Sequence, residues 1–153
     1  MIKYKWFDNS ARQHIFYCLN ILVSLILGLA VYVCFRPDTY VSHVVYNVLG
    51  VSVDGIIPTN GLPAWLLLFI RNYLGDISWA YALTFTIFYI WLGMDGKLVT
   101  AFCIVTAFEI GIEVLQKTDI VLGTFDWWDI FLEICITAFI MLLIKILHKE
   151  NKT

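Results

Sequence analysis

The chain has 153 residues, of which 61% are hydrophobic and only 14% charged, and its net charge is −2. Its mean hydropathy is +0.82, whereas a soluble domain typically has about 25% charged residues. This composition excludes a soluble protein and predicts one integral membrane domain over residues 1–153, long enough for about four or five spans.

The first predicted span covers about Ile15–Phe35 and follows the basic residues Lys3, Lys5 and Arg12. The hydrophobic core of a secretory signal is about 7–15 residues long. The uncharged stretch here has 21 residues, so we expect it to be a retained membrane helix.

An outer interfacial segment is predicted over about residues 39–75. Valines at helical spacing over Val41–Leu49 predict a helix that ends at Gly50, although their β-branched side chains leave a strand open. Pro63 then opens Ala64–Leu74, a second apolar piece. That piece is too short to span a bilayer, and Arg71 and Asn72 near its end favour a re-entrant or interfacial helix.

Three more spans are predicted at about Ile77–Gly93, Leu98–Gln116 and Trp127–Leu147, with a tight turn at 94–97. Four spans that alternate in direction divide the basic residues between the two sides of the membrane. Seven lie on the side of the termini, namely Lys3, Lys5, Arg12, Lys97, Lys145, Lys149 and Lys152. Three lie on the opposite side, namely Arg36, Arg71 and Lys117. The positive-inside rule then places both termini in the cytoplasm. The predicted fold is an all-α membrane protein, a four-transmembrane-helix bundle with the interfacial or re-entrant segment between helices 1 and 2.

Acidic residues inside the last two spans are the main functional signal. Glu109, Glu113 and Gln116 follow one another at helical spacing in an otherwise apolar span. A charged side chain at the centre of a membrane helix costs about 2.5–3.5 kcal/mol on insertion scales. We therefore expect at least one of these carboxyl groups to be protonated or to have a cationic partner.

The last span has a polar stripe of its own. Asp126, Asp129, Glu133 and Thr137 lie on one face of that helix. With both termini inside, the two stripes meet in the outer half of the membrane, level with Arg71, Asp76 and Lys117. The sequence therefore predicts an acidic, partly hydrated cavity that is open to the outside.

Some of these residues also have a purely structural interpretation. Asp126 and Asp129 can cap the last helix or complement its dipole. Glu109 and Glu133 can form interhelical hydrogen bonds. Arg71 is expected to be the counter-ion of the cluster, and the alternative is an interfacial anchor.

Small side chains and cysteines are interpreted as packing residues. Cys103, Ala107 and Gly111 form a stripe that lets a neighbouring helix approach closely, which predicts a central position for this span. None of the four cysteines, Cys18, Cys34, Cys103 and Cys135, belongs to a C-x-x-C motif, so we expect no disulfide framework. His43 has no spaced partner, and we expect no metal and no cofactor.

The order of residues in the last two spans resembles the VanZ-like family of small bacterial membrane proteins. Glu113-x-x-Gln116 is followed by a short loop and then by Asp126-x-x-Asp129. By this resemblance Glu113, Gln116 and Asp129 are the matching positions, within a match over about Pro63–Leu147. Many members have a loop arginine, an asparagine and a histidine that are absent here. Gly123–Asp126 stands at the place of the arginine, and Glu133 stands at the place of the asparagine.

The resemblance implies a role in the cell envelope, because the family takes its name from a protein associated with teicoplanin resistance. The first hypothesis is an accessory membrane protein whose outward site binds a lipid-linked precursor or a glycopeptide-like molecule. Its binding residues would be Arg71, Asp76, Glu109, Glu113, Gln116, Asp126, Asp129 and Glu133. Membrane lipids are expected partners and nucleic acid is not.

Three other functions stay open. A lipid-modifying enzyme would use paired carboxylates, with Glu113 and Asp129 as the catalytic candidates. A subunit of a proton- or cation-coupled transporter would use Glu109 and Glu113 as a relay, within an oligomer because the chain has no inverted repeat. A homo- or hetero-oligomeric assembly subunit would use the stripe of small residues.

Overall fold

The computed structural model describes residues 11–36, 40–50, 61–93, 97–118, 120, 121 and 125–150. This part of the chain is helical and contains no strand. The elements are α1 (Ala11–Phe35), α2 (Tyr40–Leu49), α3 (Ala64–Phe69), a π-helical turn (Ile70–Leu74), α4 (Gly75–Gly93), α5 (Leu98–Lys117) and α6 (Trp127–Glu150). The all-α class predicted from the sequence is confirmed.

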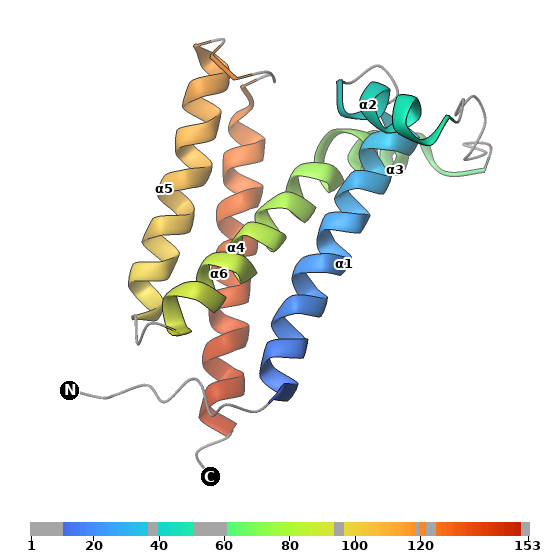
Figure 1. The fold of residues 1–153 in the computed structure, drawn as a ribbon. Helices are drawn as coiled ribbons and strands as arrows, with labels where there is room; N and C mark the ends of the chain where they lie inside the picture. Colours follow the sequence, from blue (N-terminus) through green and yellow to red (C-terminus); the bar gives the residue numbers. More distant parts are fainter. Residues whose placement is uncertain are drawn as a thin grey trace.

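Helix α4 is the centre of the arrangement, because it packs against α1, α5 and α6 (Figure 1). Helices α1 and α5 run toward the end where α2 lies, and α4 and α6 run back from it. The prediction of a central position for the span at Leu98–Gln116 is therefore wrong. Among the described helices, α5 packs mainly against α4 and α6.

The close helix contact is made by α1 and α4. A Cβ atom placed on Gly28 would lie 3.2 Å from the Cβ atom of Ser78, and the hydroxyl of Ser24 donates to the Ser78 carbonyl at 2.7 Å. In contrast, Cys103 is exposed and a Cβ atom at Gly111 would meet nothing within 4 Å. The predicted stripe of small residues thus faces away from the other described helices.

The interfacial segment contains the predicted helix. Helix α2 covers Tyr40–Leu49, which decides between the helix and the strand. It ends at Gly50 as predicted, since Gly50 has a φ of +64° and its N–H donates to the Tyr46 carbonyl at 2.8 Å.

The second apolar piece joins the next helix without a break. Ile70 and Gly75, at the two boundaries of the π-helical turn, both have right-handed helical dihedral angles. The helix therefore continues from Ala64 to Gly93, with one widened turn at Ile70–Leu74. The helix predicted over about Ile77–Gly93 is α4, which begins two residues earlier at Gly75.

Two described helices are long and apolar enough to cross a membrane, His14–Phe35 and Leu98–Lys117. Large apolar side chains are exposed on their outer faces and on α6, for example Val23, Phe108 and Phe139. The four cysteines are free, and Cys18, Cys103 and Cys135 are exposed rather than packed in the core.

Candidate functional site

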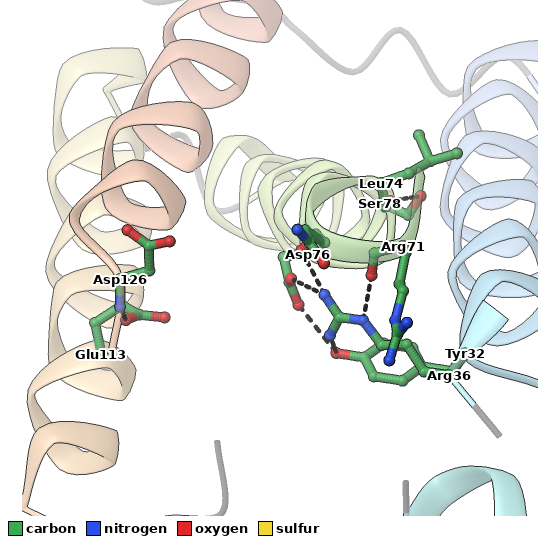
Figure 2. A network of polar contacts seen from close by, with 9 residues as sticks. Tyr32, Arg36, Arg71, Leu74, Asp76, Ser78, Glu113 and Asp126 are labelled. Carbon is green, nitrogen blue, oxygen red and sulfur yellow. Dashed lines mark hydrogen bonds and ion pairs between the residues drawn. The ribbon is translucent and has the colours of Figure 1, made fainter. Parts of the chain in front are cut away.

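An arginine clamp ties the end of α1 to the start of α4 (Figure 2). The Arg36 Nη2 atom lies 3.2 Å from Oδ2 of Asp76. The hydroxyl of Tyr32 donates to Oδ1 of the same carboxylate at 2.9 Å. Arg36 also donates from Nε to the carbonyl of Arg71 and from Nη2 to the carbonyl of Asn72.

Both carbonyls belong to the π-helical turn, a backbone form that has i→i+5 in place of i→i+4 hydrogen bonds. The guanidinium group supplies donors to Arg71 and Asn72, so the turn and Arg36 form one structural unit.

A second set of contacts connects α5 to the start of α6. The backbone N–H of Asp126 donates to Oε2 of Glu113 at 3.3 Å. The side chain of Asp126 accepts the backbone N–H of Trp128 at 2.9 Å, which is the geometry of a helix N-cap. The capping interpretation is confirmed for Asp126.

The deepest polar contact joins α4, α5 and α6. Thr137 donates to Oε1 of Glu109 at 2.9 Å, and its Oγ1 lies 2.9 Å from Oγ1 of Thr84. Thr84 also donates to the carbonyl of Ala80 at 2.7 Å. Glu109 is only 3% exposed, so the predicted interhelical hydrogen bond is present.

Charge interactions connect these contacts into one acidic cluster, formed by Asp76, Glu109, Glu113, Asp126, Asp129 and Glu133. Glu133 interacts electrostatically with Glu109, Glu113, Asp76 and Asp129. Asp129 interacts with Asp76, Asp126 and Glu113, and with the positive charge of Arg36. The two stripes predicted from the sequence therefore do lie together.

Three carboxylate oxygens of the cluster are buried and have no hydrogen-bond partner among the described residues. They are Oε2 of Glu109, Oδ1 of Asp129 and Oε2 of Glu133. Asp129 does not behave as a helix cap, because its buried oxygen is unpaired while Asp126 makes the capping bond. A buried polar atom without a partner costs about 1–3 kcal/mol and calls for an explanation.

The inner faces of three helices change from polar to apolar at the same level. On α5, Ala101 and Val105 are followed at the same spacing by Glu109 and Glu113. On α6 and α4, the polar positions Thr137 and Thr84 are followed by apolar ones. The apolar layer of these helices consists of Phe85, Phe88, Leu92, Ala101, Val105, Ile140 and Ile144, all at most 3% exposed.

The cluster therefore occupies one half of the helical core. At a rise of about 1.5 Å per residue, Glu109 lies about 12 Å from the end of α5 at Lys117. The hydrocarbon core of a bilayer is about 30 Å thick. The hydrophobic core cluster lies beyond Thr84 and Thr137, so the acidic cluster is confined to one half of the helical core.

Not every predicted residue joins the cluster. The side chain of Arg71 is exposed, and its carbonyl rather than its guanidinium takes part in the clamp. Gln116 is half-buried one turn beyond Glu113. Lys117 stacks on the ring of Phe125, with Nζ 5.0 Å from the ring centre.

Sequence analysis missed Arg36 and Tyr32 as members of the site. Their spacing of four residues at the end of an apolar helix was the available signal, since i and i+4 side chains lie on one helix face. The guanidinium carbon of Arg36 does lie 5.1 Å from the centre of the Tyr32 ring.

In the described part of the site, carboxylate oxygens that can accept hydrogen bonds outnumber the positively charged side chains. Within the described residues, no group of three or more histidine, cysteine, aspartate or glutamate side chains is placed to hold a metal ion. Ionised carboxylates accept hydrogen bonds and cannot donate them. The arrangement is therefore suited to a ligand that supplies hydrogen-bond donors or positive charge.

A comparison of the chain with protein-family models, with curated proteins and with solved structures finds no match.

Proposed function

We propose that this chain is a multi-pass membrane protein of the cell envelope, with a site at its outward end that binds the polar part of an envelope molecule. The observation that supports it most directly is the shared change of polarity on α4, α5 and α6. Asp76, Glu113 and Asp129 lie toward one end of these helices and Phe88, Val105 and Ile144 toward the other.

The four-span arrangement is part of the proposal. Helices α1 and α5 meet the requirements of length and hydropathy, and α4 and α6 pack beside them in alternating directions. A water-soluble protein rarely exposes large contiguous apolar areas. Apolar side chains exposed around α1, α5 and α6 are instead suited to lipid, and the basic residues of the sequence favour cytoplasmic termini.

The motif Glu113-x-x-Gln116 with Asp129 supports a more specific proposal. Through its resemblance to the VanZ-like family, the ligand would be a lipid-linked precursor or a glycopeptide-like molecule, and the protein would contribute to teicoplanin resistance. Glu113 and Asp129, two of the matching positions, interact electrostatically across α5 and α6.

Glycopeptide susceptibility tests this proposal. A sensitive bacterium would express the wild type or the double variant Glu113→Gln/Asp129→Asn at matched membrane levels, and teicoplanin would be compared with vancomycin. We expect protection by the wild type that the double variant loses. Asp95→Asn, two residues after the end of α4, is the matched control and should protect as the wild type does. Equal susceptibility with and without the wild type would contradict the resistance role.

The apolar layer argues against a self-sufficient proton or cation pathway. Such a pathway needs polar groups through the whole thickness of the membrane. Here the nearly fully buried residues of α4 and α6 change from polar to apolar after Thr84 and Thr137, and Phe88 and Ile140 beyond them are fully buried. A ligand would therefore enter and leave on the outer side.

A lipid-modifying enzyme is the second candidate, and one observation favours it. Glu113 is 4% exposed, whereas Asp129 is more exposed, so two interacting carboxyl groups have different surroundings. General acid–base catalysis by a carboxyl pair uses that kind of difference. Incubation of the purified protein with labelled envelope lipids would give a modified product, lost in Glu113→Gln, if this candidate is correct.

A further inference from the structure

A groove of about 360 Å³ lies between α1 and α4. That volume is within the range of about 300–1,000 Å³ that is usual for ligand pockets. Ser24 and Ser78 form its floor, since they are only 7% and 3% exposed and a hydrogen bond joins them across the two helices. Larger side chains form its walls, namely Leu19, Val23 and Leu27 of α1 and Leu74, Ile77 and Tyr81 of α4.

The groove is separate from the acidic cluster. Leu74 and Ser78 lie on the side of α4 that is turned away from Asp76 (Figure 2), and the residues that line the groove include no member of the cluster. Val23 and Leu27 are 61% and 47% exposed, so the groove opens at the outer surface of α1. Helix α1 has the length and hydropathy of a membrane span. In the proposed arrangement, this surface therefore meets the hydrocarbon chains of lipids.

The groove is most polar at one end. Asn20 and Tyr81 lie at the end nearer the start of α1, and the hydroxyl of Tyr81 donates to Oδ1 of Asn20 at 2.7 Å. Leu27 and Leu74 lie at the other end, because α1 and α4 run in opposite directions. From Leu19 to Leu27 the helix rises about 12 Å, at about 1.5 Å per residue. A polar end followed by an apolar length of this kind matches an amphiphile.

The Asn20 amide indicates which polar group that amphiphile has. An asparagine amide has two N–H donors, and one of them bonds to the carbonyl of Phe16 at 2.8 Å. The second N–H has no acceptor among the described residues, and an amide N–H without an acceptor is costly in hydrocarbon. The residues that line the groove include no lysine or arginine, so a carboxylate would have no counter-ion there. The missing group is therefore an uncharged acceptor such as an ester carbonyl.

A glycerophospholipid has an ester carbonyl joined directly to an apolar chain. With its carbonyl at Asn20, such a chain would run along the serine floor toward Leu27 and Leu74. It would then point from the side of the N-terminus toward the middle of the membrane, as the chains of that leaflet do. The basic residues of the sequence favour the cytoplasmic side for this leaflet.

We infer that the groove between α1 and α4 binds one acyl chain of a glycerophospholipid from the cytoplasmic leaflet, and that the ester carbonyl of this chain accepts a hydrogen bond from Asn20. This inference uses the proposed membrane arrangement. It goes beyond the proposed function, because the lipid occupies a surface that the outward site does not share.

Two phosphatidylcholines with the same chains test the inference. The chains of one lipid are ester-linked and those of the other are ether-linked, so only the first lipid has carbonyl acceptors next to the glycerol. The full chain is purified in mild detergent and titrated with each lipid, and native mass spectrometry counts the bound molecules. We expect one ester lipid to bind about fivefold more tightly than the ether lipid, which is the effect of one hydrogen bond.

Three variants locate the lipid. Asn20→Leu keeps the groove and removes the N–H donor, so it should bind both lipids equally. Val23→Trp places a large side chain on the exposed wall of the groove and should weaken the binding of both lipids. Leu22→Trp is the matched control, because Leu22 is 55% exposed on the same helix and does not line the groove. It should bind both lipids as the wild type does. If Asn20→Leu does not fold, the two lipids still test the carbonyl in the wild type, and Val23→Trp still tests the groove.

Other results would overturn the inference. Equal affinity of the wild type for the two lipids would contradict recognition of a carbonyl, and binding that Val23→Trp leaves unchanged would place the lipid elsewhere. If Val23→Trp turns a dimer into a monomer and leaves lipid binding unchanged, the groove belongs to a second copy of the chain. These three results leave the outward site and its glycopeptide test unaffected. Release of the wild type from membranes by alkaline carbonate would overturn both the inference and the proposed multi-pass arrangement.

Discussion

Arg36 and Asp76 form an ion pair of 3.2 Å that joins the residue after α1 to the first turn of α4. The same guanidinium group binds the carbonyls of Arg71 and Asn72 in the π-helical turn. The Arg36 side chain therefore holds the start of α4 and the π-helical turn against the end of α1. It also orients the carboxylate of Asp76, which interacts electrostatically with Asp129 and Glu133.

Replacement of Arg36 by glutamine should destabilise this junction. The change removes the counter-charge of Asp76 and the donors to two backbone carbonyls. Hydrogen bonds to charged groups contribute about 1.5–3 kcal/mol, and partial exposure of the pair reduces the contribution of the charge itself. We expect the free energy of unfolding in detergent micelles to fall by about 2 kcal/mol. Arg71→Gln, at an exposed side chain of the same charge, should change it by less than about 0.5 kcal/mol. An equal loss in both variants would assign the effect to net charge.

Close packing of α1 on α4 gives a prediction that distinguishes two glycines. Gly28→Leu should separate the helices, because even a Cβ atom there would lie 3.2 Å from Ser78. Overpacking of this kind costs about 1–3 kcal/mol. Gly111→Leu, on the open side of α5, should leave the unfolding free energy of the monomer unchanged or slightly higher, since leucine is the better helix former. Thermal unfolding of the two variants in micelles measures both effects.

The oligomeric state of the Gly111→Leu variant is a separate measurement. If the wild type is oligomeric in mild detergent and Gly111→Leu is monomeric, the stripe of Cys103, Ala107 and Gly111 is an interface between chains. An unchanged oligomeric state contradicts that use of the stripe.

Much of the fold could be predicted from periodicity. The helices at Ala11–Phe35, Leu98–Lys117 and Trp127–Glu150 were recognisable as apolar stretches. Gly50 was recognisable as a helix end because glycine adopts a positive φ readily. The polar stripes of α5 and α6 were recognisable from helical angles, but Thr137 as the partner of Glu109 was not specified by them.

The errors concern choices between several faces that are equally suited to packing. The stripe of Cys103, Ala107 and Gly111 has the spacing of a close-packing face, but spacing alone does not identify the partner helix. Ser24 and Gly28 have the same four-residue spacing of small side chains, and they make the close contact with α4. Arg36 was missed because two of its acceptors are backbone carbonyls of the π-helical turn Ile70–Leu74, and the residue types there do not indicate such a turn.

Topology can be measured with single cysteines, and it tests the four-span proposal. In a variant without the four native cysteines, Ile120→Cys and Leu62→Cys should react with a membrane-impermeant maleimide in spheroplasts. Ile120 lies between α5 and α6 and Leu62 before α3, and both are exposed. Lys97→Cys, exposed before α5, should react only after the membrane is permeabilised. The reverse pattern would place the acidic cluster on the cytoplasmic side, and reaction of all three in intact spheroplasts would contradict the four spans.

Replacement of Thr137, which is bonded to Glu109, should lower the free energy of unfolding more than replacement of Thr84. Thr137→Val keeps the shape of the side chain but leaves both oxygens of Glu109 without a donor among the described residues. A buried acceptor that loses its partner costs about 1–3 kcal/mol. Thr84→Val removes the contact with Thr137 and keeps the bond to Glu109, so it should cost less than about 1 kcal/mol. Unfolding of both variants in micelles gives the comparison. Equal losses would show that the three groups act as one network, and a larger loss for Thr84→Val would contradict Glu109 as the acceptor that depends on Thr137.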